Sequence, residues 1–164
     1  MDGSESVFSE ELGLKPEIIL IPYDLKNLDE VHRLVSLIRD YYPSSPWPVT
    51  PEKISAGGVV YFKAKLGEQE IGMTGYARKT PTLAETVKTT VFHEFRGQGL
   101  GNVLSQAIED ECRRIGITKV MSTVYYFNHH MLQIKLKQGY TIEGYHPDHE
   151  APGFHEYSLG KVLT

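Results

Sequence analysis

The sequence contains little cysteine, and Cys112 is its only one. A single cysteine excludes an internal disulfide framework. Cys112 falls on the apolar stripe of a predicted helix, so we interpret it as a small core residue rather than as a nucleophile. A chain of 164 residues can bury a sufficient hydrophobic core without disulfides or bound metals.

Long apolar runs and an excess of basic residues are also missing. No run of about 18 or more apolar residues occurs, so the sequence predicts no membrane span. The first residues, "MDGSESVFSEELG", are acidic and have neither the basic nor the apolar region of a signal peptide, so we expect a cytoplasmic protein. The net charge of −4 argues against broad binding of nucleic acid, and any anionic ligand must then be held by local groups.

The hydrophobic pattern predicts a chain of the mixed α/β class. Residues 1–15 have little periodicity and are expected to form a mobile tail, followed by a single domain over residues 16–164. Short apolar runs predict strands at 17–23, 57–66, 70–79, 84–92, 117–126, 140–146 and 154–163. Apolar spacing and capping signals predict helices at 27–42, from Pro51, at 100–115 and at 128–139.

Polar residues and glycines mark where several of these elements begin and end. Asn27, followed three residues later by Glu30, is a variant of the capping box that opens a helix. Gly67 begins a short turn between two strand-like runs, which predicts a hairpin. Asn128 is expected to open the last helix and Gly139 to close it.

The stretch "VFHEFRGQGLG", residues 91–101, suggests a binding function. A strand-like run ends there, three glycines follow within five residues, and an amphipathic helix begins. The N-terminus of a helix leaves about four backbone N–H groups without partners and carries a positive dipole. Because glycine has no Cβ, the backbone can approach a ligand closely. Together these features predict an anion cradle, best suited to a pyrophosphate.

Three nucleotide-binding patterns can be compared with this turn. A Walker A loop requires G-x-x-x-x-G-K-[ST], which does not occur. A Rossmann turn requires a third glycine where this chain has Asn102 or Leu104. The string "RGQGLG" matches R-x-x-G-x-G instead. The alternative is a turn that binds nothing, but three glycines beside Arg96 exceed what a tight turn needs, because each is entropically costly.

This turn resembles motif A of the GNAT superfamily of N-acetyltransferases, and the resemblance extends beyond it. Family members often carry an acidic residue eleven positions before the motif arginine, where this chain has Glu85. They usually have asparagine at the start of the next helix, where Asn128 stands, and then a Gly-Phe or Gly-Tyr pair, as in Gly139-Tyr140. The resemblance covers about residues 17–163. It implies a mixed, mostly antiparallel sheet of about six to seven strands, with helices on both faces and a splayed parallel strand pair that binds CoA.

The resemblance also implies acetyl-CoA as the cosubstrate, an amine as the acceptor and no metal. Backbone amides from Gln98 through Gly101 would hold the pyrophosphate, with added charge from Arg96 and His93. The pantetheine arm would pair with the strand near Val91, where an amide can also polarise the thioester carbonyl. The residues that the resemblance implies in cofactor binding are Val91, Phe92, His93, Arg96, Gly97, Gln98, Gly99, Leu100, Gly101, Asn102, Asn128 and Lys135.

Attack on a thioester requires a neutral amine. An alkyl amine with a pKa near 10.4 is only about one part in 2,500 neutral at pH 7, which costs roughly 4.6 kcal/mol of barrier. Glu85, acting through water, is the first candidate for the base, and it is equally suited to be an ordinary carboxylate at a strand end. Weaker candidates are Glu68, Glu70 and His93.

The leaving thiolate is stabilised by a proton or a positive charge. Family members often use a tyrosine four residues before the Gly-Phe glycine, but this chain has Lys135 there. Lys135 either stabilises a thiolate or phosphate or is a solvated helix lysine. Tyr125 and Tyr126, at a strand end, are alternative catalytic proton donors or packing residues. Because a free thiol ionises near pKa 8.5, a dedicated acid is not essential.

Two further segments are expected around the acceptor. Trp47 is either a lid aromatic or part of a small satellite core. The stretch "HPDHEAPGFHEY" is expected to form an opposite wall that suits a small polar amine. Its histidines, including His155, also suggest a metal site, but a loop with free carboxylates and imidazoles more often faces solvent or substrate.

The sequence therefore predicts transfer of an acetyl group from acetyl-CoA to a primary amine of a small molecule or peptide, by direct attack on the thioester. The alternative is a module that binds acyl-CoA without turnover and acts as a sensor or partner-binding domain. A longer acyl donor is a third option. The amine, the oligomeric state and the residues that serve as base and acid stay open, and the resemblance implies a homodimer as one option.

Overall fold

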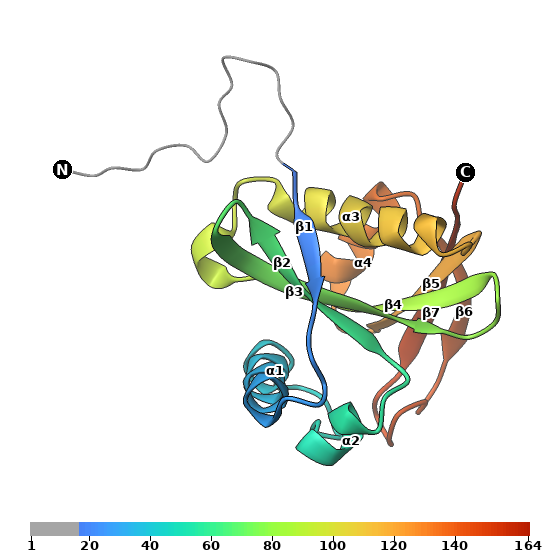
Figure 1. Cartoon of the computed structure of the whole chain (residues 1–164). Coiled ribbons are helices and arrows are strands. Elements are labelled where there is room, and N and C mark those ends of the chain that lie inside the picture. Colours follow the sequence, from blue (N-terminus) through green and yellow to red (C-terminus); the bar gives the residue numbers. More distant parts are fainter. Residues whose placement is uncertain (1–16) are drawn as a thin grey trace.

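The computed structural model describes residues 17–164, which form one seven-stranded sheet with helices on both faces (Figure 1). The strands lie in the order β1-β2-β3-β4-β5-β7-β6, and every neighbouring pair is antiparallel except β4 and β5. Their bounds are β1 Ile19–Pro22, β2 Val60–Leu66, β3 Gln69–Arg78, β4 Leu83–Val91, β5 Lys119–Tyr125, β6 Thr141–His146 and β7 Glu156–Val162. The predicted fold class is confirmed, and the tail predicted at residues 1–15 lies outside the described residues.

Two helices cover each face of the sheet. α1 and α2 pack on one face, and α3 and α4 pack on the other (Figure 1). Their bounds are α1 Leu28–Tyr41, α2 Pro51–Ser55, α3 Leu100–Arg114 and α4 His129–Lys137. Among residues 17–164, no helix combines the length and the apolar character needed to cross a membrane.

The predicted capping box at the start of α1 forms only in part. Asn27 accepts a hydrogen bond from the N–H of Glu30, as expected. The return bond from the Asn27 N–H does not form within the described residues, because that group donates to the Asp24 carbonyl oxygen and the Glu30 carboxylate accepts from the Asp24 N–H. Asn128 caps α4 as predicted, by accepting from the N–H of Met131 at 3.1 Å.

Apolar side chains from both helix layers are buried against the sheet. Leu34 of α1 packs with Met73 on one face, and Leu104 of α3 packs with Ile71 on the other. Cys112 of α3 is fully buried, and burial raises the pKa of its thiol to about 11. Its position agrees with the interpretation as a core residue, because a thiol with a raised pKa is a poor nucleophile at neutral pH.

The parallel strands β4 and β5 pair over only three residues each, 83–85 with 119–121. Beyond these pairs β4 continues along β3 and β5 continues along β7, so the facing edges of β4 and β5 part. β4 also contains a bulge, at which Lys88 has a φ of 53°. Gly72 of β3 permits the close approach there, because a Cβ on it would lie 2.2 Å from the Thr90 carbonyl oxygen. This parting determines where the site lies.

We expect Leu104→Ala to lower the free energy of unfolding by about 2–5 kcal/mol, because it removes a fully buried side chain and leaves a cavity. Leu136→Ala on α4 is the control, since Leu136 is 44% exposed and its loss should cost less than about 0.5 kcal/mol. Urea denaturation followed by circular dichroism measures both values. Equal losses would contradict the described packing of α3.

Candidate functional site

The turn between β4 and α3 leaves the first turn of that helix open. Gly97 and Gly99 have φ angles of +80° and +75°, a left-handed conformation that glycine adopts without strain. Gly99 is the N-cap of α3 and forms no side-chain cap. No acceptor within residues 17–164 bonds to the N–H groups of residues 98–101, and a Cβ added at Gly97, Gly99 or Gly101 would meet nothing within 4 Å. These N–H groups are therefore free to bind an anion.

Tyr41, at the end of α1, supports the segment that leads into this turn. Its hydroxyl accepts a hydrogen bond from the His93 N–H at 3.0 Å. Its ring centroid lies 4.7 Å from that of His93, 5.7 Å from that of Phe92 and 5.6 Å from the Arg96 guanidinium carbon. Arg96 Nε also donates to the Val91 carbonyl oxygen at 3.1 Å. The structure thus brings three predicted residues, Phe92, His93 and Arg96, together on Tyr41, which the sequence pattern does not single out.

A small polar cavity of about 220 Å³ lies between α3 and α4. It is lined by Asn102, Ser105, Gln106, Glu109, Lys137, Gln138 and Lys161. Gln138 Nε2 donates to Asn102 Oδ1 at 3.0 Å, and Lys161 donates to both carboxylate oxygens of Glu109 at 3.0 Å. The Oε1 atom of Gln138 is buried without a hydrogen-bond partner in the described structure, so it can accept from a ligand N–H.

Lys135 is buried on this face, so its interpretation as a solvated helix lysine is wrong. Its residue exposure is 8%, and its Nζ lies 4.8 Å from the centroid of the Tyr140 ring. Burial lowers the pKa of Lys135 to about 8. The negative charge of Glu109 opposes this shift, and the positive charge of Lys161 adds to it. The Tyr140 hydroxyl in turn lies 3.5 Å from Oγ1 of Thr86, the residue at which β4 leaves β5. The Tyr140 ring therefore lies between the buried ammonium of Lys135 and the point where β4 and β5 part.

The face of the sheet covered by α1 and α2 holds two carboxyl groups, Glu150 and Glu156, here called the carboxylate pair. Glu156 begins β7 opposite Tyr125 of β5 and is 4% exposed. Glu150, from the segment between β6 and β7, accepts from the Tyr125 hydroxyl at 3.2 Å and lies close enough to Glu156 to raise its pKa. Burial, followed by the charge and hydrogen bonding of Glu150, raises the pKa of Glu156 to about 7. The pair can therefore gain or lose a proton near neutral pH.

Two charged residues of β4 act on this pair. Glu85 raises the pKa of Glu156, and Lys88 lowers it. The Lys88 ammonium lies 4.3 Å from the centroid of the Tyr42 ring, and burial lowers the pKa of Lys88. Glu85 forms an ion pair with Lys79 at 3.2 Å. The first predicted base therefore already has a cationic partner.

Aromatic side chains lie around the carboxylate pair. The ring of Tyr125 stacks on Phe127 and meets Phe154 edge-on, with centroids 5.3 Å and 5.7 Å apart. Trp47 Nε1 donates to the Glu150 carbonyl oxygen at 2.7 Å while the residue stays 62% exposed. This exposure does not agree with a place for Trp47 in a small core. Trp47 instead joins the segment after α1 to the wall predicted at "HPDHEAPGFHEY".

Hydrogen bonds also organise the histidine-rich segment between β6 and β7. The Asp148 N–H donates to His155 Nδ1 at 2.9 Å, and Asp148 Oδ1 accepts from the Gly153 N–H at 2.7 Å. The Tyr126 ring lies 5.0 Å from the His155 ring, whereas Tyr125 contacts Glu150, so the structure separates the two tyrosines. In the described part of the chain no group of three or more potential ligands is arranged for a metal ion.

The sequence pattern does not single out the carboxylate pair, although both residues lie in the predicted wall. The available signal is that Glu156 is the one acidic residue in the apolar run "FHEYSLGKVL". This signal gains meaning only when the register places Glu156 opposite Tyr125 and burial is known.

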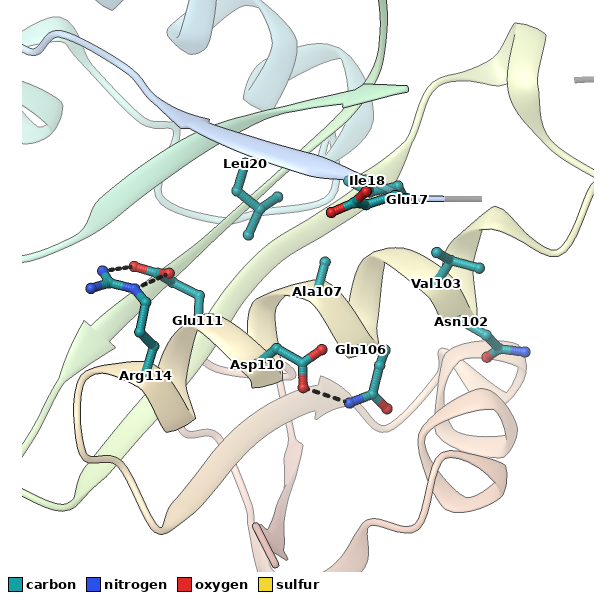
Figure 2. Close-up of a pocket in the computed structure, with 10 residues that line it drawn as sticks. All are labelled: Glu17, Ile18, Leu20, Asn102, Val103, Gln106, Ala107, Asp110, Glu111 and Arg114. Carbon is teal, nitrogen blue, oxygen red and sulfur yellow. Dashed lines mark hydrogen bonds and ion pairs between the residues drawn. The ribbon is translucent and has the colours of Figure 1, made fainter. Parts of the chain in front are cut away.

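A larger hollow of about 790 Å³ lies between α3 and β1 (Figure 2). Four of its polar side chains are already paired with one another, because Arg114 donates to Glu111 and Gln106 donates to Asp110 (Figure 2). Of the residues expected to bind the cofactor, Asn102 alone lines it. Despite its size, this hollow does not include residues 98–101 and their free N–H groups.

Comparison with protein families gives a match over most of the chain. The model described as the acetyltransferase (GNAT) family matches residues 29–140, which is more than half of the sequence. No curated protein sequence gives a significant match.

Solved structures of similar fold include three acetyltransferases. An aminoglycoside 6'-N-acetyltransferase in complex with coenzyme A is 16% identical, with a TM-score of 0.71 over 89% of this chain and 97% of that chain. An IAA acetyltransferase from Bacillus cereus is 16% identical, with a TM-score of 0.69 over 90% and 100% of the two chains. An acetyltransferase of Bacillus subtilis in complex with CoA is 16% identical, with a TM-score of 0.65 over 92% and 100%. At these identities the likeness shows the fold.

The raised pKa of Glu156 predicts a pH-dependent effect of Glu156→Gln on stability. Because the folded-state pKa of about 7 lies above the ordinary value of 4.5, protonation of Glu156 stabilises the fold, and this contribution is lost as the pH rises through 7. A neutral glutamine avoids that loss. The free energy of unfolding of the variant, relative to that of the wild type, should therefore rise by roughly 1–3 kcal/mol from pH 5 to pH 8. Urea denaturation at each pH measures it.

Glu143→Gln is the control for this measurement. Glu143 lies on β6 at the surface and pairs with Lys119, so its replacement should change stability equally at both pH values. A difference between Glu156→Gln and the wild type that is also constant with pH would contradict the raised pKa.

Proposed function

Because the chain belongs to the GNAT family of acetyltransferases, we propose that it transfers an acetyl group from acetyl-CoA to the primary amine of a small molecule or peptide. The observation that carries this proposal is the set of unpartnered N–H groups at residues 98–101, next to the end of β4 where it has parted from β5. The coenzyme A in two structures of similar fold supports a CoA thioester as the donor.

In this proposal the face of α3 and α4 holds the cofactor. The N–H groups of residues 98–101 bind the pyrophosphate, and Arg96 adds positive charge beside them. The edge of β4 near Val91, which β5 does not pair, offers backbone groups to the amides of the pantetheine arm. Gln138 Oε1, buried without a partner in the described structure, accepts a further N–H of the arm.

The proposed reaction needs no covalent intermediate on the protein. The amine nitrogen attacks the thioester carbonyl carbon, the new C–N bond forms and the C–S bond breaks. A backbone N–H of β4 stabilises the oxyanion. The proton that the nitrogen loses goes to the leaving thiolate, and the ammonium of Lys135, which is buried on the cofactor face, stabilises that thiolate by its charge.

Release of free thiol from acetyl-CoA tests the proposed function. The chain is mixed with acetyl-CoA and a panel of alkyl amines, polyamines, aminosugars and peptides, and the acetylated product is identified by mass spectrometry. Turnover with at least one amine is the expected result. Tight binding of CoA without release on any amine would favour the acyl-CoA-binding module instead. Propionyl-CoA and butyryl-CoA, tested in parallel, show whether a longer donor is used.

Gly99→Leu should weaken CoA binding at least tenfold, which corresponds to about 1.4 kcal/mol. The added side chain projects from the N-cap of α3, where the Cβ position is now open, and it blocks the approach of the pyrophosphate. Isothermal titration calorimetry with CoA measures the change.

Gly116→Leu is the matched control for the strain that this substitution introduces. Gly116 also has a positive φ, of +90°, and open space at its Cβ, but it lies just beyond the other end of α3. Both variants should lose about 1–2 kcal/mol of stability, whereas Gly116→Leu should bind CoA normally. Normal binding by Gly99→Leu would show that the cradle is assigned to the wrong turn.

A further inference from the structure

The carboxylate pair lacks a cation of its own. Glu156 is 4% exposed, and neither Glu156 nor Glu150 forms an ion pair with any lysine, arginine or histidine in residues 17–164. Taking a carboxylate out of water without a partner is costly. Other acidic residues on this sheet face do have partners, as Glu85 has Lys79. The pair therefore combines a buried carboxyl group, Glu156, with an exposed one, Glu150, and neither has its charge balanced by an ion pair in the described residues.

The charged and titratable groups that face Glu156 come from two strands and one loop. β4 contributes Glu85 and Lys88, the segment before β7 contributes Glu150, and β5 contributes the Tyr125 hydroxyl through Glu150. Lys88 acts on the pair at a distance, because its ammonium lies over the Tyr42 ring. Because Glu85 is paired with Lys79, the remaining charged groups are the two carboxyl groups of Glu150 and Glu156 and the ammonium of Lys88.

The surroundings of the pair also favour a cation. Trp47 and Tyr125 each contact Glu150 through a hydrogen bond, at 2.7 Å and 3.2 Å, and Tyr125 carries the rings of Phe127 and Phe154 beside it. Aromatic faces attract ammonium groups, and the attraction is larger where water is excluded. Carboxylates and aromatic rings together are the side chains that a protein uses to recognise an alkylammonium ion.

We propose that the carboxylate pair binds the ammonium group of the acceptor and that Glu156 takes its proton, so that the acceptors are cationic alkyl amines without a carboxylate beside the amine. This inference rests on the proposed acetyl transfer. The ammonium gives one proton to the Glu156 carboxylate, and the neutral amine attacks the thioester carbon. The second proton of the nitrogen goes to the leaving thiolate, and Glu156 releases its proton to solvent when the product leaves.

Two observations support this role for Glu156. Its position opposite Tyr125 places it at the end of β5, the strand that has parted from β4. Its pKa of about 7 is close to the value that suits a base at neutral pH, whereas a surface carboxylate is a much weaker base. An acceptor with its own carboxylate next to the amine would bring like charge against the pair, which costs affinity.

The first test replaces each carboxyl group in the full chain. Glu156→Gln should lower kcat at least about 100-fold and remove the rise of kcat/KM with pH that is centred near pH 7, whereas the Kd for CoA stays unchanged. Glu150→Gln should raise KM for the amine and shift that rise to lower pH, because it removes a negative neighbour of Glu156. Glu143→Gln, at the exposed surface of β6, is the control and should match the wild type.

The second test compares matched acceptors that differ by one carboxylate: ethanolamine with serine, isobutylamine with valine, and tyramine with tyrosine. Any other amine that supports turnover is compared in the same way with its counterpart that carries a carboxylate beside the amine. We expect kcat/KM to be at least tenfold higher for the amine of each pair that reacts. Equal use of the two members would overturn the proposed selectivity. If Glu156→Gln kept the activity and the pH profile of the wild type, Glu156 would not be the base. The proposal of acetyl transfer would still stand. A wild-type chain that binds CoA but acetylates no amine would overturn both.

Discussion

The limited pairing of β4 with β5 is the constraint on which the whole site depends. Backbone N–H and C=O groups in a sheet normally satisfy one another, but this ladder stops after three residues, because β3 holds β4 through a bulge and β7 holds β5. Both strands keep their other neighbours, so the sheet stays continuous while two inner edges become available. A ligand can then be bound by backbone groups in the middle of the sheet rather than at its outer strands.

The two faces of this opening differ in charge. On the side of α3 and α4 lie the free N–H groups of residues 98–101 and the buried ammonium of Lys135, which suit an anion. On the side of α1 and α2 lie Glu150 and Glu156 with aromatic neighbours, which suit a cation. A chain with a net charge of −4 can therefore attract ligands of opposite sign to opposite faces, because local groups outweigh the net charge.

Features encoded by neighbouring residues could be predicted from the sequence. The glycines at residues 97–101, the cap at Asn128 and the seven strands depend on local conformation and periodicity, and the structure agrees with them. The state of Lys135 depends on how α4 lies against Tyr140, so its burial could not be read from helical spacing. Glu156 and Tyr41 are further examples, because their contacts depend on register and packing between segments far apart in the chain.

The hydrogen bond from Trp47 to the Glu150 carbonyl joins residues 103 positions apart in the sequence. The glycine-rich turn at residues 97–101, in contrast, is made by consecutive residues between β4 and α3. Closing a long loop costs more entropy than closing a short one, and contacts of large sequence separation slow folding. As the ribosome delivers the chain from its N-terminus, the turn can take shape early, whereas the wall at residues 146–157 is completed only after β7 has been synthesised and paired.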